Sequence, residues 1–168
     1  MNSTLLINIA RFIILILAQV AFFDKINFLG YINPYPYILF IILYPVNANK
    51  NVLLLASFLL GLTMDMFNNS GGVHATSCIT LAYLRPSFFK FSFGLSYEYQ
   101  TVKIADKITP ERVSFLILAI FIHHLVLFLL EFFRLSLIVS VIGRTFLATI
   151  FTFFMCLLII YLIKPNKR

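Results

Sequence analysis

Six long stretches of apolar residues alternate with short polar stretches along this chain. The apolar stretches are Leu5–Phe23, Tyr35–Val46, Val52–Phe67, Val73–Leu84, Val113–Phe133 and Leu135–Ile163. A helix needs about 20 apolar residues to cross the hydrocarbon core of a membrane, and the first, fifth and sixth stretches have that length unaided. The pattern predicts an all-α, polytopic membrane protein with about six transmembrane helices.

We expect a single integral membrane domain over residues 1–168. Its helices are expected near residues 5–23, 30–46, 52–67, 73–92, 110–133 and 136–163, with a cytoplasmic loop near 93–109.

The second helix is the weak point of this assignment, because Pro34 and Pro36 precede a short apolar stretch that contains Pro45 near its end. It crosses the membrane only if residues 29–33 also enter the bilayer or the bilayer thins locally. The alternative is a re-entrant hairpin formed by the second and third stretches and sheltered by protein.

Composition supports a membrane protein. Hydrophobic residues make up 61% of the chain, charged residues make up 11%, and the mean hydropathy is +0.99. A soluble core of this size could not bury so many apolar side chains. The net charge of +7 does not indicate nucleic-acid binding, because the cations lie mainly in the loops between apolar stretches rather than in a basic soluble patch.

The loop charges predict an orientation. With six crossings, Lys25 and Arg134 lie on one side of the membrane, and Arg11 and Arg144 lie within helices. Arg11 is near enough to a helix end for its side chain to snorkel to the membrane surface. The other side holds both termini and Lys50, Arg85, Lys90, Lys103, Lys107, Arg112, Lys164, Lys167 and Arg168. By the positive-inside rule, both termini are expected to be cytoplasmic.

The third predicted helix carries Ser57, Gly61 and Asp65 at four-residue steps, which places them on one face. Small residues on such a face allow a neighbouring helix to approach closely. Asp65 therefore points into protein rather than lipid. It either orders the following turn or is a buried carboxylate that a cation partners.

The sixth predicted helix carries a stripe of small residues with one arginine in it. Ser140, Arg144, Ala148 and Thr152 recur every four residues, which is typical of a helix-packing seam. An arginine near the helix centre costs about 3 kcal/mol to insert, so Arg144 is expected to meet a carboxylate. Asp65 and Glu131 are the candidates inside the membrane.

The fifth predicted helix contains His123, His124 and Glu131, and the seven-residue step places His124 and Glu131 on one face. Hydrogen bonds between helices explain the imidazoles most simply. A proton relay through His and Glu is the alternative.

Signatures of enzymes and of metal or cofactor sites are not found. The chain has no HExxH, GxSxG or phosphate-loop motif, and its His and Cys residues are not at metal-binding spacing. Cys78 and Cys156 are expected to be small packing residues. We therefore expect no catalytic residue, no metal and no cofactor.

The chain resembles the bacterial rod shape-determining MreD family. The resemblance covers nearly the whole chain in its size and six apolar stretches. It includes the proline-flanked second stretch at Asn33–Pro36, and Gly61 to Asp65 followed by the turn at Gly71–Gly72. Of the polar residues inside the membrane, Gly61 and Asp65 match the family motif, whereas His123, His124 and Arg144 belong to no family pattern.

The resemblance implies a non-enzymatic subunit of the cell-elongation machinery that supports peptidoglycan synthesis. Its implied partners are the bitopic protein MreC, the filament protein MreB, the RodA glycosyltransferase and a penicillin-binding transpeptidase. Membrane lipids are also expected as partners, whereas nucleic acid is not. The family's fold is similar to the S components of energy-coupling-factor transporters.

Two other functions are kept as alternatives. The first is a vitamin-binding S component, although Ala10, Ala18 and Ala21 of the first helix lack the A-x-x-x-A spacing by which such proteins dock their coupling subunit. The second is an intramembrane enzyme that uses His123, His124 and Glu131.

Overall fold

The computed structural model describes residues 3–30, 32–94 and 109–163, and all regular structure in these ranges is helical. The elements are α1 (Ser3–Ala21), η1 (Phe23–Lys25), η2 (Pro36–Ile38), α2 (Leu39–Ile42), α3 (Lys50–Asn68), α4 (Val73–Phe93), α5 (Pro110–Phe132), η4 (Leu135–Leu137) and α6 (Ile138–Ile163). The predicted all-α, polytopic fold class is confirmed. Most of the loop expected near 93–109 and the basic tail at 164–168 lie outside the described residues.

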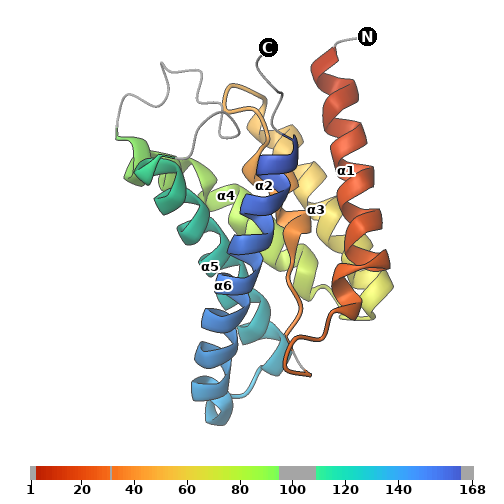
Figure 1. Cartoon of the computed structure of the whole chain (residues 1–168), viewed down its shortest axis with the longest axis vertical. Coiled ribbons are helices and arrows are strands. Elements are labelled where there is room, and N and C mark those ends of the chain that lie inside the picture. Colours follow the sequence, from red (N-terminus) through yellow and green to blue (C-terminus); the bar gives the residue numbers. More distant parts are fainter. Residues whose placement is uncertain (1–2, 31, 95–108, 164–168) are drawn as a thin grey trace.

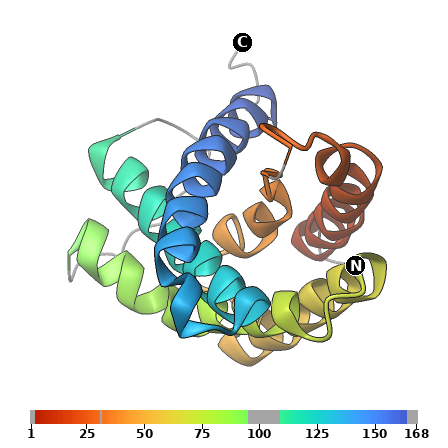
Figure 2. The same cartoon turned by 90° about the horizontal axis from the view of Figure 1, so that it is seen from below.

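Five long helices surround the short helix α2. Seen along the bundle, α1, α3, α4, α5 and α6 form a ring, and the segment that contains α2 lies inside it (Figure 2). The side chains of Tyr37, Ile38, Leu39, Ile41 and Ile42 are 0% exposed. The centre of the molecule is therefore filled by its own chain.

Successive segments run in alternating directions along the bundle, so α1 begins and α6 ends at the same end (Figure 1). We call this the proximal end and the other, where α3 turns into α4, the distal end. Lys50 opens α3, Lys90 lies in the last turn of α4, and Arg112 lies in the first turn of α5, all at the proximal end. The arrangement agrees with an even number of crossings.

The prediction of a continuous helix over 30–46 is wrong. This segment has no regular structure at Asn33–Tyr35 and is helical only from Pro36 to Ile42, yet it runs from the distal toward the proximal end (Figure 1). Pro34 and Pro36 lack the backbone N–H that a helix needs, and proline disfavours helical geometry in the residue before it. The segment is neither a full helix nor a re-entrant hairpin, and we call residues 32–44 the broken crossing.

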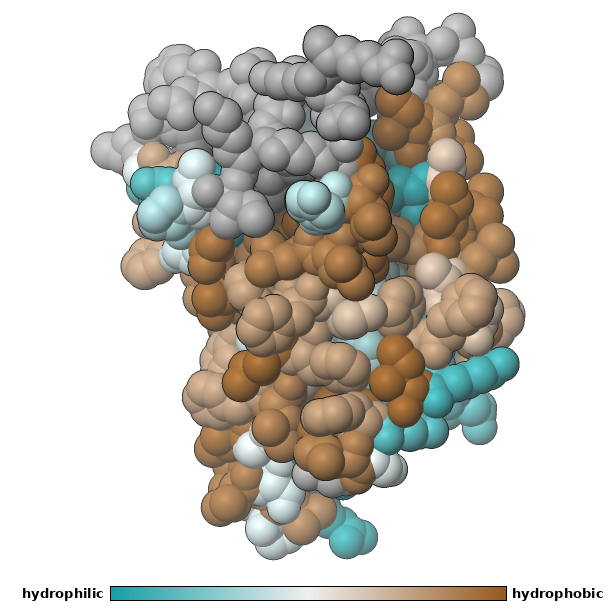
Figure 3. Space-filling view, viewed as in Figure 1, coloured by the Kyte–Doolittle hydropathy of each residue, from teal (hydrophilic) through white to brown (hydrophobic). Residues whose placement is uncertain are grey.

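The outer surface of the bundle is apolar. In the described residues, four helices are long and apolar enough to cross a membrane: α1 with the following turn, α3, α5 and α6. Large apolar side chains such as Ile14, Leu17, Ile150 and Phe154 are 54–63% exposed, and the face in Figure 3 is mainly hydrophobic between its ends. Such a surface is stable when lipid or partner helices cover it.

Candidate functional site

The first half of the broken crossing exposes backbone groups that no helix satisfies, and side chains from α1 and α6 bind them. Nε2 of Gln19 donates to the Pro34 carbonyl at 3.0 Å, and the Tyr37 N–H donates to Oε1 of Gln19 at 3.4 Å. The Tyr35 N–H donates to Oγ1 of Thr152 at 3.0 Å. In a bilayer every backbone polar group needs such a partner, because water is absent.

Two arginines bind the carbonyls at the other end of the broken crossing. Nη1 of Arg11 donates to the Leu43 carbonyl at 3.2 Å. Nη2 of Arg85 donates to the Ile42 carbonyl at 3.3 Å and to the Tyr44 carbonyl. Cations stabilise the negative end of a helix dipole. Arg11, for which snorkelling was expected, is half-buried and donates to the protein backbone, and Arg85, counted with the loop cations, is a buried residue of α4.

Tyr37 joins two histidines at the centre of the bundle. Its hydroxyl lies 2.8 Å from Nδ1 of His74 in α4 and 3.0 Å from Nε2 of His123 in α5. The phenol can donate to one imidazole and must accept from the other, so the two rings carry opposite roles. The three side chains are at most 5% exposed, and they tie the broken crossing to α4 and α5.

A second hydrogen-bonded chain runs through His124. Nδ1 of His124 lies 2.7 Å from the Ile120 carbonyl, and since that oxygen can only accept, Nδ1 carries the proton. Nε2 then accepts from Oγ1 of Thr152 at 3.2 Å, while the same hydroxyl oxygen accepts from the Tyr35 N–H. A neutral imidazole therefore satisfies every polar atom in the chain from Tyr35 to Ile120.

Within the described part of the chain, Asp65 binds the N-terminus of α4. Its Oδ1 accepts from Oγ of Ser70 at 2.5 Å and from the His74 N–H at 2.9 Å, and its Oδ2 accepts from the Ala75 N–H at 2.9 Å. The residue that precedes α4, Gly72, has no side chain to supply this cap. Asp65 therefore caps α4 from the neighbouring helix, which favours the simpler of the two interpretations made from the sequence.

Gly61 lies where α3 and α4 come closest together. A Cβ atom at Gly61 would be 2.4 Å from Cα of Ala75 and 2.5 Å from the His74 carbonyl oxygen. Ser57, one turn away, is also fully buried. The close approach predicted for this face of α3 is found, and its partner is another helix of the same chain.

Arg144 lies near Glu131, the other carboxylate that the sequence offered. The two side chains interact electrostatically, and Cζ of Arg144 is 4.9 Å from the centre of the Phe132 ring. Glu131 is exposed at the distal end of α5, whereas His124 is fully buried. The shared face of these two residues therefore does not bring them into one relay.

The stripe predicted on α6 is buried in part. Ala148 and Thr152 are 0% exposed, whereas Ser140 is exposed, so the predicted seam is wrong at its first position. A four-residue step turns about 40° too far for an α-helix, so a strict four-residue stripe drifts off the packed face. The buried residues of α6 are Val141, Thr145, Ala148, Thr149, Thr152, Cys156 and Ile160.

The sequence interpretation missed Gln19, Tyr37, His74 and Arg85. Gln19 carried a usable signal, because an amide within an apolar helix has to find a polar partner. The sequence carries no signal that distinguishes Tyr37 and His74 from other interfacial residues, because their hydrogen bond joins positions 37 residues apart. Arg85 was counted with the loop cations because it follows the fourth apolar stretch, although the helix expected near 73–92 contains it.

The chemistry of the network is that of hydrogen bonding between helices. No group of three or more His, Cys, Asp or Glu residues within the described ranges could hold a metal ion. Sγ of Cys78 is 4.0 Å from Nε2 of His123, which itself faces Tyr37. Comparison with protein-family models, curated proteins and solved structures finds no match to this chain. Its function must therefore be inferred from the residues and their contacts.

Proposed function

We propose that this chain is a non-enzymatic inner-membrane subunit of the bacterial cell-elongation complex, as its resemblance to the MreD family implies. The carrying observation is that a connected set of polar groups at the centre of the bundle bind one another and the broken crossing. Tyr37, His123, His124 and Thr152 are all 0% exposed and hydrogen-bonded within the chain. This supports a scaffold whose intramembrane polar residues hold its shape.

The same observation speaks against the vitamin-binding alternative. A protein that transports a small molecule needs a cavity among its helices that buries most of the surface of the ligand. Here the broken crossing fills the middle of the ring, with Tyr37, Leu39 and Ile41 at 0% exposure, and the cavity that the described residues line lies at the proximal end instead. An intramembrane enzyme is likewise disfavoured, because His124 is buried and Glu131 lies exposed at a helix end.

Partners of such a scaffold would bind through its apolar outer surface or its basic proximal end. Helix–helix association in lipid depends on close packing and polar pairs. We propose an MreC-like bitopic protein as the membrane partner, with MreB, RodA and the penicillin-binding transpeptidase as further members of the complex. The basic proximal end would face the cytoplasm and its anionic lipid surface.

Removal of the gene from its bacterial host tests the proposal. We expect cells to lose rod shape, and a plasmid-borne wild-type copy to restore it. A photoreactive residue at exposed Ile14 or Ile150 should then crosslink to a single-span membrane protein, whereas one that replaces the buried aromatic residue Phe115 should not. Rod-shaped cells that fail to grow without an added vitamin would contradict the proposal and favour transport.

A further inference from the structure

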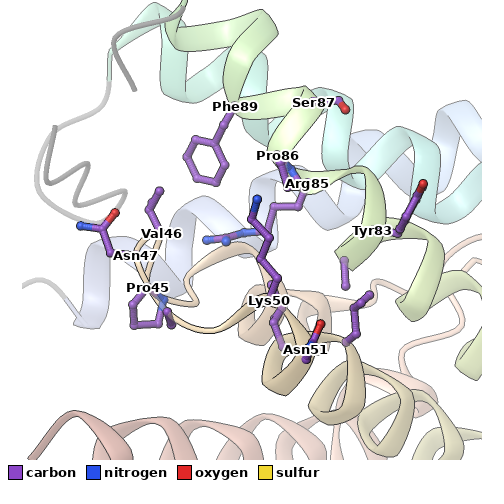
Figure 4. A pocket seen from close by; sticks show the side chains of 14 residues that line it. Pro45, Val46, Asn47, Lys50, Asn51, Tyr83, Arg85, Pro86, Ser87 and Phe89 are labelled. Carbon is purple, nitrogen blue, oxygen red and sulfur yellow. The ribbon is translucent and has the colours of Figure 1, made fainter. Parts of the chain in front are cut away.

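A cavity of about 660 Å³ opens at the proximal end of the bundle (Figure 4). Its walls come from the loop between α2 and α3, from the first turns of α3, and from the middle of α4. Its volume is in the range of pockets that bind small molecules. Of the hydrogen-bonded residues described above, Arg85 lines the cavity, whereas Tyr37, His74, His123 and His124 do not.

The lining of this cavity is positively charged. Lys50 and Arg85 both project into it, Asn47, Asn51 and Ser87 are further polar lining residues, and no Asp or Glu of the described ranges lines it (Figure 4). Two cations that share a confined space repel each other unless an anion lies between them.

Arg85 provides a second, independent observation. The residue is 5% exposed, and its Nη2 is engaged by the Ile42 and Tyr44 carbonyls. Its Nε is also buried but has no hydrogen-bond partner among the described residues. A buried guanidinium N–H without an acceptor is costly, and the planar guanidinium is suited to oxygen atoms of phosphate.

The distribution of charge along the bundle points the same way. The carboxylates of Asp24, Asp65 and Glu131 lie near the distal ends of α1, α3 and α5, away from the cavity. Near the proximal end, Lys90 and Arg112 add to the charge of Lys50 and Arg85, and Glu111 opposes them. An anion that approaches this end therefore meets a positive field.

We propose that this cavity binds the phosphate group of an anionic ligand, carried either by a membrane lipid or by a soluble phosphate ester. Arg85 and Lys50 hold the phosphate oxygens, and the amides of Asn47 and Asn51 surround them. The apolar side chains of Leu53, Leu54 and Phe89 complete the wall and suit the hydrocarbon part of a lipid. This inference does not depend on the function proposed above.

Titration of phosphatidylglycerol into the full-length protein in an uncharged detergent tests the proposal, with thermal unfolding as the readout. A ligand that binds the folded state raises the unfolding midpoint. We expect phosphatidylglycerol to raise it and phosphatidylcholine not to. Lys50→Gln should weaken the apparent affinity roughly fivefold, as expected for one basic residue at an anionic headgroup. Lys50 is exposed, so its loss leaves the fold intact.

Lys25→Gln is the matched control, because Lys25 is an exposed lysine at the distal end. Glycerol 3-phosphate, added alone and in competition, separates the two sources of the phosphate. If glycerol 3-phosphate competes with phosphatidylglycerol, a soluble phosphate ester is sufficient for binding. If it does not compete, the ligand is a lipid. Both results support the site. Equal shifts with the two lipids and none with glycerol 3-phosphate, or equal losses in the two lysine variants, would overturn it.

Discussion

At Gly61 the chain has no room for a side chain. A methyl group there would overlap the backbone of α4 at Ala75, which cannot move without shifting the helix. We expect Gly61→Ala to destabilise the protein by about 1–3 kcal/mol, the usual cost of overpacking. Gly143→Ala is the control, because Gly143 is also helical and nothing lies within 4 Å of its added Cβ.

Thermal unfolding of both glycine variants can be followed with a thiol-reactive dye in detergent. Cys78 and Cys156 are 0% exposed, so they react when the bundle opens. Gly143→Ala should unfold at the wild-type temperature or slightly above it, because alanine favours a helix more than glycine does. Equal midpoints for the two variants would show that α3 and α4 are not in close contact at Gly61.

The three hydrogen bonds of Asp65 give a second prediction. Asp65→Ala leaves the His74 and Ala75 N–H groups without their acceptor, at a cost of about 1–3 kcal/mol. Asp65→Asn should cost less, because its remaining oxygen can still accept. Since the Asp65 carboxylate accepts from Ser70, His74 and Ala75, we expect the effects of Asp65→Ala and Arg144→Ala on the free energy of unfolding to add. A coupling above about 0.5 kcal/mol in the double variant would contradict this.

At this scale the sequence indicates which residues are polar inside the membrane but not what they contact. Ser57, Gly61 and Asp65 were placed correctly on one face because a single helix determines their spacing. The partner of Asp65 could not be predicted, because it is a backbone N–H of α4, and a backbone N–H is present at every residue except proline. For the same reason a cation partner was kept as an alternative to turn ordering, whereas the structure uses the N-terminus of a helix.

Among the elements, the broken crossing depends most on its neighbours. Thr152 both accepts from the Tyr35 N–H and donates to His124, so Thr152→Val leaves two buried groups unsatisfied. We expect a loss of about 1–3 kcal/mol in the free energy of unfolding. Thr145→Val is the matched control, because the Thr145 hydroxyl is buried on the same helix without a partner among the described residues.

The dye assay distinguishes the two threonine variants. Valine has the shape of threonine, so neither variant leaves a large cavity and the difference reports hydrogen bonding. Thr145→Val should be neutral or stabilising, because it removes an unsatisfied hydroxyl. If Thr145→Val destabilises as much as Thr152→Val, the hydroxyl of Thr152 does not support the broken crossing.

The long helices were predictable because each has to match the thickness of a bilayer with apolar side chains. The helices α5 and α6 begin and end within two residues of the expected positions near 110–133 and 136–163. The broken crossing was not predictable, because its stability comes from Gln19, Arg85 and Thr152, which lie far from it in the chain. Local pattern is silent about such contacts.

For the molecule as a whole, the orientation in the membrane is open to a direct test. Single cysteines at Lys25 and Lys90 lie at the distal and proximal ends, and the native Cys78 and Cys156 are buried. We expect an impermeant thiol reagent to label Lys25→Cys in intact cells and Lys90→Cys only after permeabilisation, because positive loops stay cytoplasmic. The reverse pattern would place the phosphate cavity outside the cell.

The broken crossing also constrains the order in which the protein is made. Its residues 32–44 leave the ribosome long before Thr152, which follows Tyr35 by 117 residues. A short segment interrupted by proline cannot enter lipid alone, because its backbone N–H and C=O groups would lack hydrogen-bond partners. The broken crossing therefore has to remain at the membrane surface or in the insertion machinery until the last helix is synthesised. The outer helices assemble before the central segment during translation.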